Sequence, residues 1–259
     1  MKYFYILILV LFSTSHNIAQ NLVETSTNEA ISNSGLSLTT FDNYYSNPSA
    51  LADLKTINFQ ITLKNFYELE SLFSKSIAIG FPIKNQNTYT SIYYNSSGTS
   101  FFRNQNLGIG VGKRIFKQIS IGANFQLGNQ VIEGWSTPIN FNIAIGLIYT
   151  ANNKIKYSSV YRFSRDYSVL TFGMEYKLLN DLNLYLSVNK ELKSNIEFRY
   201  GLIYSINKMI NIGIGMVPLR SSITMGTTFL FKDNIEIGVS FQKDLYLGYS
   251  PTATVKISW

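Results

Sequence analysis

From residue 56 to the end of the chain, apolar side chains recur at every second position in one run after another. Neighbouring side chains of a β-strand point to opposite faces, so such a run has one apolar face and one polar face. The last run shows the pattern, with apolar positions alternating with polar ones: Ala253, Val255, Ile257 and Trp259 against Thr252, Thr254, Lys256 and Ser258. The alternation predicts an all-β chain.

The length of these runs fits strands that cross a membrane. A tilted membrane strand has about 9 to 11 residues, with an apolar face towards lipid and a polar face towards the lumen. Similar runs occur along the whole chain, at 57–63, 119–127, 139–149, 170–178, 182–188, 196–206 and 235–241. A soluble β-sandwich also alternates, so the period alone leaves both fold classes open.

The connections between the runs favour a membrane barrel. Long and short connections alternate along the chain, beginning with those predicted at 65–73, 85–87, 95–104, 116–118 and 128–137. An up-and-down barrel produces this alternation, because tight periplasmic turns lie on one rim and longer loops on the other. The sequence therefore predicts a transmembrane antiparallel β-barrel of about fourteen strands, with both ends in the periplasm.

The low content of charged residues is typical of a protein whose surface is only partly exposed to water. Charged residues make up 14% of the chain, against roughly 25% in soluble domains. The net charge of +7 comes from Lys and Arg residues that are scattered singly. Scattered cations do not form a nucleic-acid site, and we expect no nucleic-acid partner. Phosphates of lipopolysaccharide, or a polar lumen, account for such an excess equally well.

The first residues have the features of an export signal. Lys2 precedes the apolar run 3–12, which is too short to span a bilayer, and we expect cleavage after Ala19. The only histidine, His16, lies in this segment, and the chain has no cysteine. A mature chain without either residue lacks the usual groups of nucleophilic, acid–base and metal catalysis. We therefore predict no enzyme activity, no metal site and no cofactor.

The inner face of the predicted barrel carries glycines and charges. The alternating glycines at 108, 110, 112, 213 and 215 share the inward face and leave room for a segment inside the lumen. Charged side chains on that face are expected to pair or to line a polar path. Those predicted to face the lumen are Lys64, Lys113, Arg162, Glu175, Lys177, Glu197, Arg199 and Glu236.

Residues 20–55 form the one long stretch without strand periodicity. A barrel of fourteen strands is wider than the eight-stranded size that side chains alone can fill. The domain prediction is thus a signal peptide at 1–19, a plug at 20–55 and an outer-membrane barrel at 56–259. Within the plug, Pro48 forces Asn47 out of the helical region and opens a short helical turn. We expect 47–52 inside the barrel near its periplasmic mouth, with Tyr44 and Tyr45 packed against lumen-facing residues.

This segment carries a family resemblance. Gly35, Asp42 and the motif Asn47, Pro48, Ser49, Ala50, Leu51, Ala52 resemble the N-terminal segment of FadL-related barrels, including the PorV and PorQ group of the type IX secretion system. Those barrels carry Asn-Pro-Ala-x-Leu-Ala in the lumen, and Ser49 replaces the usual alanine. The stretch 247–251 resembles small barrels from Bacteroidota.

The resemblance implies two alternative functions. FadL proteins move hydrophobic molecules through a lateral opening, which implies passive transport of small apolar solutes here. PorV-like members hold secreted cargo, which implies a secretion or cell-surface scaffold without transport activity, with secretion-system components as partners. This chain is shorter than typical members of either group.

Trp259 ends the chain on the apolar face, after Val255 and Ile257. This arrangement resembles the terminal aromatic signal that the barrel assembly machinery reads in outer-membrane proteins. The partners expected from the sequence are therefore that machinery, outer-membrane lipid and lipopolysaccharide.

Replacing Trp259 with Asp should slow barrel insertion and lower the amount of protein in the outer membrane, because the terminal signal loses its aromatic ring. Pulse-chase labelling, with the folded form followed by its faster migration on unboiled detergent gels, measures the rate. Normal assembly of Trp259→Asp would show that the residue is only a lipid contact.

Overall fold

Fourteen strands form one closed, antiparallel sheet in the computed structural model. The structure describes residues 25–83, 87–133, 135–136, 139–165, 167–191, 194–232 and 234–259. The predicted signal peptide, 1–19, lies outside the described residues. Each barrel strand pairs with the next along the chain, and β1 pairs with β15 to close the ring. The predicted up-and-down barrel of about fourteen strands is confirmed.

The barrel strands are β1 (Asn58–Asn65), β2 (Phe73–Ile83), β3 (Thr88–Gly98), β4 (Phe102–Phe116), β5 (Ile119–Ile132), β7 (Asn140–Thr150), β8 (Ile155–Ser164), β9 (Ser168–Leu179), β10 (Leu182–Glu191), β11 (Glu197–Ser205), β12 (Ile210–Val217), β13 (Ser222–Phe231), β14 (Ile235–Asp244) and β15 (Gly248–Ser258). The two-residue strand β6 (Trp135–Ser136) only extends the end of β5. A short 3₁₀ helix, η4 (Pro218–Arg220), joins β12 to β13.

The two faces of the wall follow the alternation. On β14, Val239 is 48% exposed, whereas its neighbour Ser240 faces the interior and is 4% exposed. The same division recurs around the ring, so that the outer surface is dominated by exposed Ile, Leu, Val, Phe and Tyr side chains. Exposing so continuous an apolar surface to water is energetically unfavourable, whereas contact with the hydrocarbon of a bilayer is not.

We call the barrel end where β1 begins and β15 ends the termini rim, and the opposite end the loop rim. Two loop-rim connections are shorter than the sequence predicts. The loop expected at 95–104 shrinks to 99–101, since β3 and β4 continue to pair through Asn95 and Asn106. The loop expected at 128–137 begins only after Ile132. Hydrogen bonds between strands join backbone atoms and do not need an apolar face. Strand pairing therefore continues into polar strand ends, where the sequence no longer alternates between apolar and polar residues.

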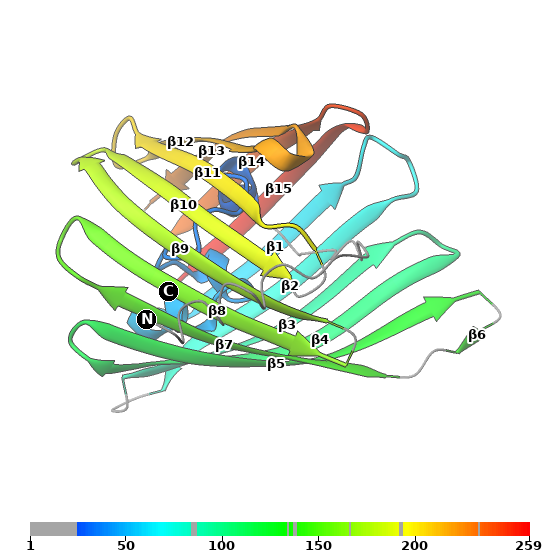
Figure 1. Cartoon of the computed structure of the whole chain (residues 1–259), viewed down its shortest axis with the longest axis horizontal. Helices are drawn as coiled ribbons and strands as arrows, with labels where there is room; N and C mark the ends of the chain where they lie inside the picture. The colour runs from blue at the N-terminus through cyan, green and yellow to red at the C-terminus, as the bar shows by residue number, and fades with distance from the viewer. Residues whose placement is uncertain are drawn as a thin grey trace, which may run out of the picture.

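The N-terminal segment, residues 25–55, lies inside the ring of strands, where it is coloured blue in Figure 1. It contains the helix α2 (Ser26–Ala30) and two 3₁₀ helices, η2 (Phe41–Asn43) and η3 (Pro48–Asp53). Thr25 caps α2, and Asn47 caps η3 with Pro48 in its first turn, as the sequence predicts for Pro48. Among the described residues, no helix has the length and hydropathy to cross a membrane.

Replacing Ile145, which is 55% exposed in the middle of β7, with Lys should destabilise the inserted barrel by about 2–4 kcal/mol, because the charge meets hydrocarbon. Urea titration of the protein in lipid vesicles measures the free energy of unfolding. The control is Thr171→Lys, on the inner face opposite Val160. Equal losses from both substitutions would contradict a lipid-facing outer surface.

Candidate functional site in the barrel lumen

A row of glycines flattens the inner wall where the N-terminal segment meets it. Gly112, Gly122 and Gly146 stand opposite one another on β4, β5 and β7. A Cβ added to Gly112 would lie 2.6 Å from the Pro48 carbonyl oxygen, and one on Gly122 would overlap the backbone of Pro48. At this contact, the backbone of η3 therefore lies directly against the backbone of the wall.

A second group of inward glycines faces α2 and the turn that follows it. A Cβ on Gly213 would lie 2.8 Å from the Ala30 side chain, and one on Gly215 would overlap the backbone at Ile31. A Cβ on Gly110 would lie 2.7 Å from Ser91 Oγ of the wall and 3.5 Å from Leu51 Cδ1 of the segment. The predicted inward glycines thus face the lumen and leave room for the segment inside it. The same relation holds for glycines that the prediction did not name: Gly173, Gly201, Gly226 and Gly238.

The Asn-Pro-Ser-Ala-Leu-Ala motif is buried and internally bonded. Asn47 Oδ1 accepts hydrogen bonds from the Ser49 backbone nitrogen at 3.1 Å and from Ser49 Oγ at 2.6 Å. Asn47 Nδ2 donates to the Leu36 carbonyl oxygen at 2.8 Å. Ala50 and Leu51 have no exposed surface. The Ser49 hydroxyl, absent from the alanine of the related motif, adds a bond to the same cap.

Aromatic side chains join the segment to the wall. The Tyr44 ring lies 5.1 Å from that of Tyr93 on β3, and the Tyr45 ring lies 5.7 Å from it. Phe41 packs against Tyr44 and against Tyr89. Tyr44 and Tyr45 thus contact lumen-facing residues as the sequence predicts. Burial raises the pKa of the Tyr44 phenol, so this group stays neutral, and its oxygen lies 3.0 Å from Ser76 Oγ.

Two buried ionic contacts tie the segment to the seam between β1 and β15. Glu29 on α2 lies 2.8 Å from Lys64 Nζ on β1. Asp42 in η2 lies 3.0 Å from Lys256 Nζ on β15, and Glu236 on β14 lies 2.8 Å from the same nitrogen. Removing one partner of a buried pair typically costs about 3–5 kcal/mol, because the other charge is left uncompensated. These pairs therefore favour the position of the segment in which each charge has its partner.

Most predicted lumen-facing charges point inward. Lys64 and Glu236 take part in the seam contacts. Arg162 donates to the Tyr45 carbonyl oxygen at 3.0 Å and lies 5.0 Å from the Tyr45 ring centroid. Glu175 pairs with Lys156 at 3.3 Å, and Lys177 follows on the same face of β9.

Glu197 forms a smaller cluster near the loop rim. It accepts from Arg199 Nε at 2.7 Å and also pairs with Arg220 of η4. Both Glu197 and Arg199 are buried within the described part of the chain. This group lines the interior away from the N-terminal segment.

The prediction for Lys113 is wrong. Gly112 faces inward, so Lys113 shares the outward face with Val111, and its cross-strand neighbour Ile121 is 38% exposed. The inward cation at this end of β4 is Arg114, which pairs with Asp53 of η3. The predicted site also omitted Glu29, Asp42 and Lys256 as charge partners. Only Lys256 had a sequence signal, its inward place in the alternation of β15.

The interior is arranged to hold a peptide segment through close packing, hydrogen bonds and ion pairs. Across the described residues, no group of three or more His, Cys, Asp or Glu side chains is placed to bind a metal ion. A small pocket between the segment and the wall is lined by Tyr45, Tyr93, Ile143, Ala144 and Arg162, with three amide side chains. This pocket combines aromatic and aliphatic surfaces with one cation.

Comparison with known proteins finds no matching family model and no matching curated protein. Solved structures do match in fold. The Pseudomonas putida toluene transporter TodX aligns with a TM-score of 0.68 at 10% identity, covering 96% of this chain and 98% of that one. The Ralstonia pickettii toluene transporter TbuX gives 0.66 at 9% identity, covering 93% and 98%.

A Pseudomonas aeruginosa FadL homologue aligns with a TM-score of 0.64 at 8% identity, covering 91% of this chain and 98% of that one. At these identities the likeness concerns the fold, and it identifies the fold as FadL-like. The FadL-like part of the sequence-based resemblance is supported at that level.

Replacing Gly122 with Ala should displace η3, because the new Cβ overlaps the Pro48 backbone and such overpacking typically costs about 1–3 kcal/mol. The chain has no cysteine, so a single Ala50→Cys substitution reports on η3 through its rate of maleimide labelling. We expect faster labelling in the Gly122→Ala background.

The matched control is Gly128→Ala on the same strand, whose Cβ would have the Asn106 side chain and the Asn140 carbonyl oxygen as its nearest neighbours. Labelling should stay slow there. Equal rates in the two backgrounds would contradict the close contact between η3 and the glycine row.

Proposed function

We propose that this chain is a passive outer-membrane channel for small apolar solutes, with residues 20–55 as its lumen plug. The observation that carries the proposal is a FadL-like barrel with an N-terminal segment packed inside it. The proteins of similar fold include toluene transporters and a FadL homologue. The apolar outer surface supports insertion in a bilayer.

The contacts of the plug suggest how it would act. Its grip on the wall consists of glycine contacts, hydrogen bonds and ion pairs, none of them covalent. A solute moving from the loop rim towards η3 would have to displace Tyr45 and Tyr93, which are buried against each other. Passage then requires that part of the plug moves, and the charges Lys177 and Arg199 line the interior outside the plug.

The proposal includes the steps that precede function. Residues 1–19 serve as the export signal, Val255, Ile257 and Trp259 as the insertion signal, and the termini rim faces the periplasm. The alternative, a PorV- or PorQ-like scaffold in a Bacteroidota secretion system, finds no support in the comparisons.

A disulfide between the plug and the wall should stop transport. A Cβ on Gly238 would lie 3.2 Å from Ser26 Cβ, slightly below the roughly 3.5–4.5 Å of natural disulfides. Cells that make the wild-type protein should take up the apolar dye N-phenyl-1-naphthylamine faster than cells without it. Cells with Ser26→Cys/Gly238→Cys should do so only after reduction, because the oxidised pair holds α2 in place.

The single variant Ser26→Cys controls for the substitution and should be insensitive to oxidation. Dye uptake at the background rate with the wild-type protein would refute the channel and favour the scaffold alternative. Full uptake through the oxidised double variant would show that solutes pass without movement of α2.

A further inference from the structure

A row of uncharged, outward-facing side chains crosses four strands of the wall. Thr227, Val239, Ala253 and Leu63 stand opposite one another on β13, β14, β15 and β1. The row ends at Lys75 on β2, the partner of Leu63. We call the groove along this row the outer trough.

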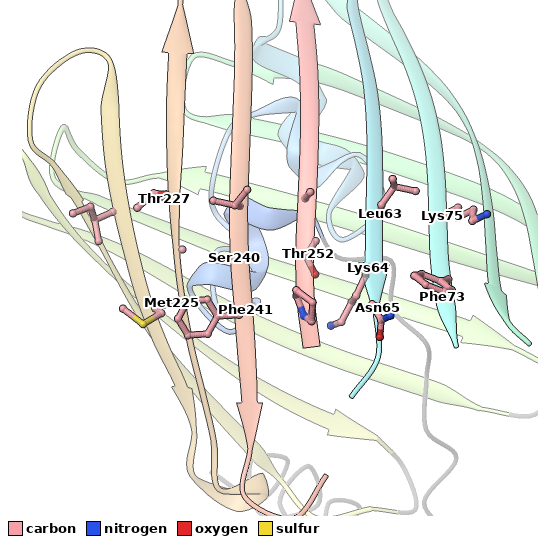
Figure 2. Close-up of a pocket in the computed structure, with 15 residues that line it drawn as sticks. Leu63, Lys64, Asn65, Phe73, Lys75, Met225, Thr227, Ser240, Phe241 and Thr252 are labelled. Carbon is pink, nitrogen blue, oxygen red and sulfur yellow. The ribbon is translucent and has the colours of Figure 1, made fainter. Parts of the chain in front are cut away.

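Outward-facing side chains of the two adjacent rows border the outer trough. Towards the loop rim stand Met225, Phe241 and Pro251, one row away. Towards the termini rim stand Phe229, Ile237, Val255, Ile61 and Ile77. Figure 2 shows the residues that line the trough, which encloses about 870 Å³, with the pale blue N-terminal segment behind the strands.

The inward side of the same strands is occupied. Ser240 Oγ donates to Glu29 at 3.1 Å, and Lys64 pairs with Glu29. The Ser26 backbone nitrogen donates to Thr254 Oγ1 at 2.9 Å. With α2 behind it, the outer trough is open to the lipid side, and its occupant comes from the membrane.

Two lysines supply positive charge beside this apolar groove. Lys75 lies at the end of the row and faces outward near the start of β2, and the described part of the chain offers it no carboxylate. Lys243 faces outward near the end of β14, with its ammonium 5.4 Å from the Tyr249 ring centroid. A lysine on the lipid face costs about 2–4 kcal/mol at the bilayer midplane and about 0–1 kcal/mol at the interface. Their place near the loop rim suits the depth of lipid headgroups.

We propose that the outer trough binds an acyl chain of a phosphorylated glycolipid in the outer leaflet, with Lys75 and Lys243 pairing with its phosphates. The apolar lining matches the acyl chain, and ammonium groups pair well with phosphate. Lys75 is in register with Val239, so Lys243 lies three strand spacings away across the sheet and four residues away along the strands. At about 4.8 Å per strand and about 3.3 Å per residue, their backbones are about 20 Å apart. That separation is too wide for one phosphate to bridge and favours a headgroup with two phosphates. The inference rests on the outer-membrane location in the proposed function and is independent of transport.

Native mass spectrometry of the full-length protein in neutral detergent, titrated with diphosphoryl lipid A, tests the proposal. Ala253→Trp fills the trough, and Lys75→Gln/Lys243→Gln removes the charges. Each should raise the dissociation constant for lipid A about tenfold, which corresponds to about 1.4 kcal/mol of binding free energy. Faster migration on unboiled gels verifies that each variant is folded. Arg103→Gln is the matched control, since Arg103 also faces outward near the loop rim but lies on β4.

The proposal is overturned if neither variant weakens binding, if Arg103→Gln weakens it equally, or if phosphatidylcholine binds as tightly as lipid A. Binding with the expected variant pattern, in a protein that fails to take up the dye, would leave the lipid site intact and refute only the channel. Dye uptake without lipid binding would refute only the lipid site.

Discussion

Contact between two backbones, without side chains between them, fixes how the N-terminal segment lies in this barrel. Gly112, Gly122 and Gly146 remove three Cβ atoms from one row of the wall, and η3 fills the space. An alanine at any of the three positions would place its methyl group in space that Asn47 or Pro48 occupies. The inner face therefore needs glycine as strictly as the outer face needs apolar side chains, and strand alternation supplies both from the same residues.

The buried charges have a different role from the glycines. Taking Glu29 and Lys64 out of water offsets much of their mutual attraction, so the pair adds little net stability. A mispositioned segment, however, would leave both charges unpaired. The same holds for Asp42 and Lys256. Because these partners lie on β1 and β15, the contacts favour the position in which the N-terminal segment bridges the strands that close the ring.

The sequence predicted the barrel well because the alternation of apolar and polar residues indicates which face of a strand each residue occupies. It predicted the charged interior less well where the alternation is weak. Lys113 and Arg114 are both basic and lie next to a register shift at the end of β4, so neither residue indicates its own face. The glycines at 108, 110 and 112 would have given the correct face. They face inward at every second position, so Lys113 must face outward. Glu29 and Asp42 were beyond prediction, since their segment has no period that places a side chain relative to the wall.

Side chains one residue apart on these strands serve different surroundings. Val239 and Ala253 line the outer trough, while Ser240 and Thr254 bind the N-terminal segment from the other side. The wall between them is a single sheet, and small residues on both faces make it thin there. A substitution of Val239 therefore acts on the outer face, whereas a substitution of Ser240 acts on Glu29 of the N-terminal segment. The face of the strand on which a side chain lies, more than its distance from the lumen, determines whether its substitution affects the outer trough or the N-terminal segment.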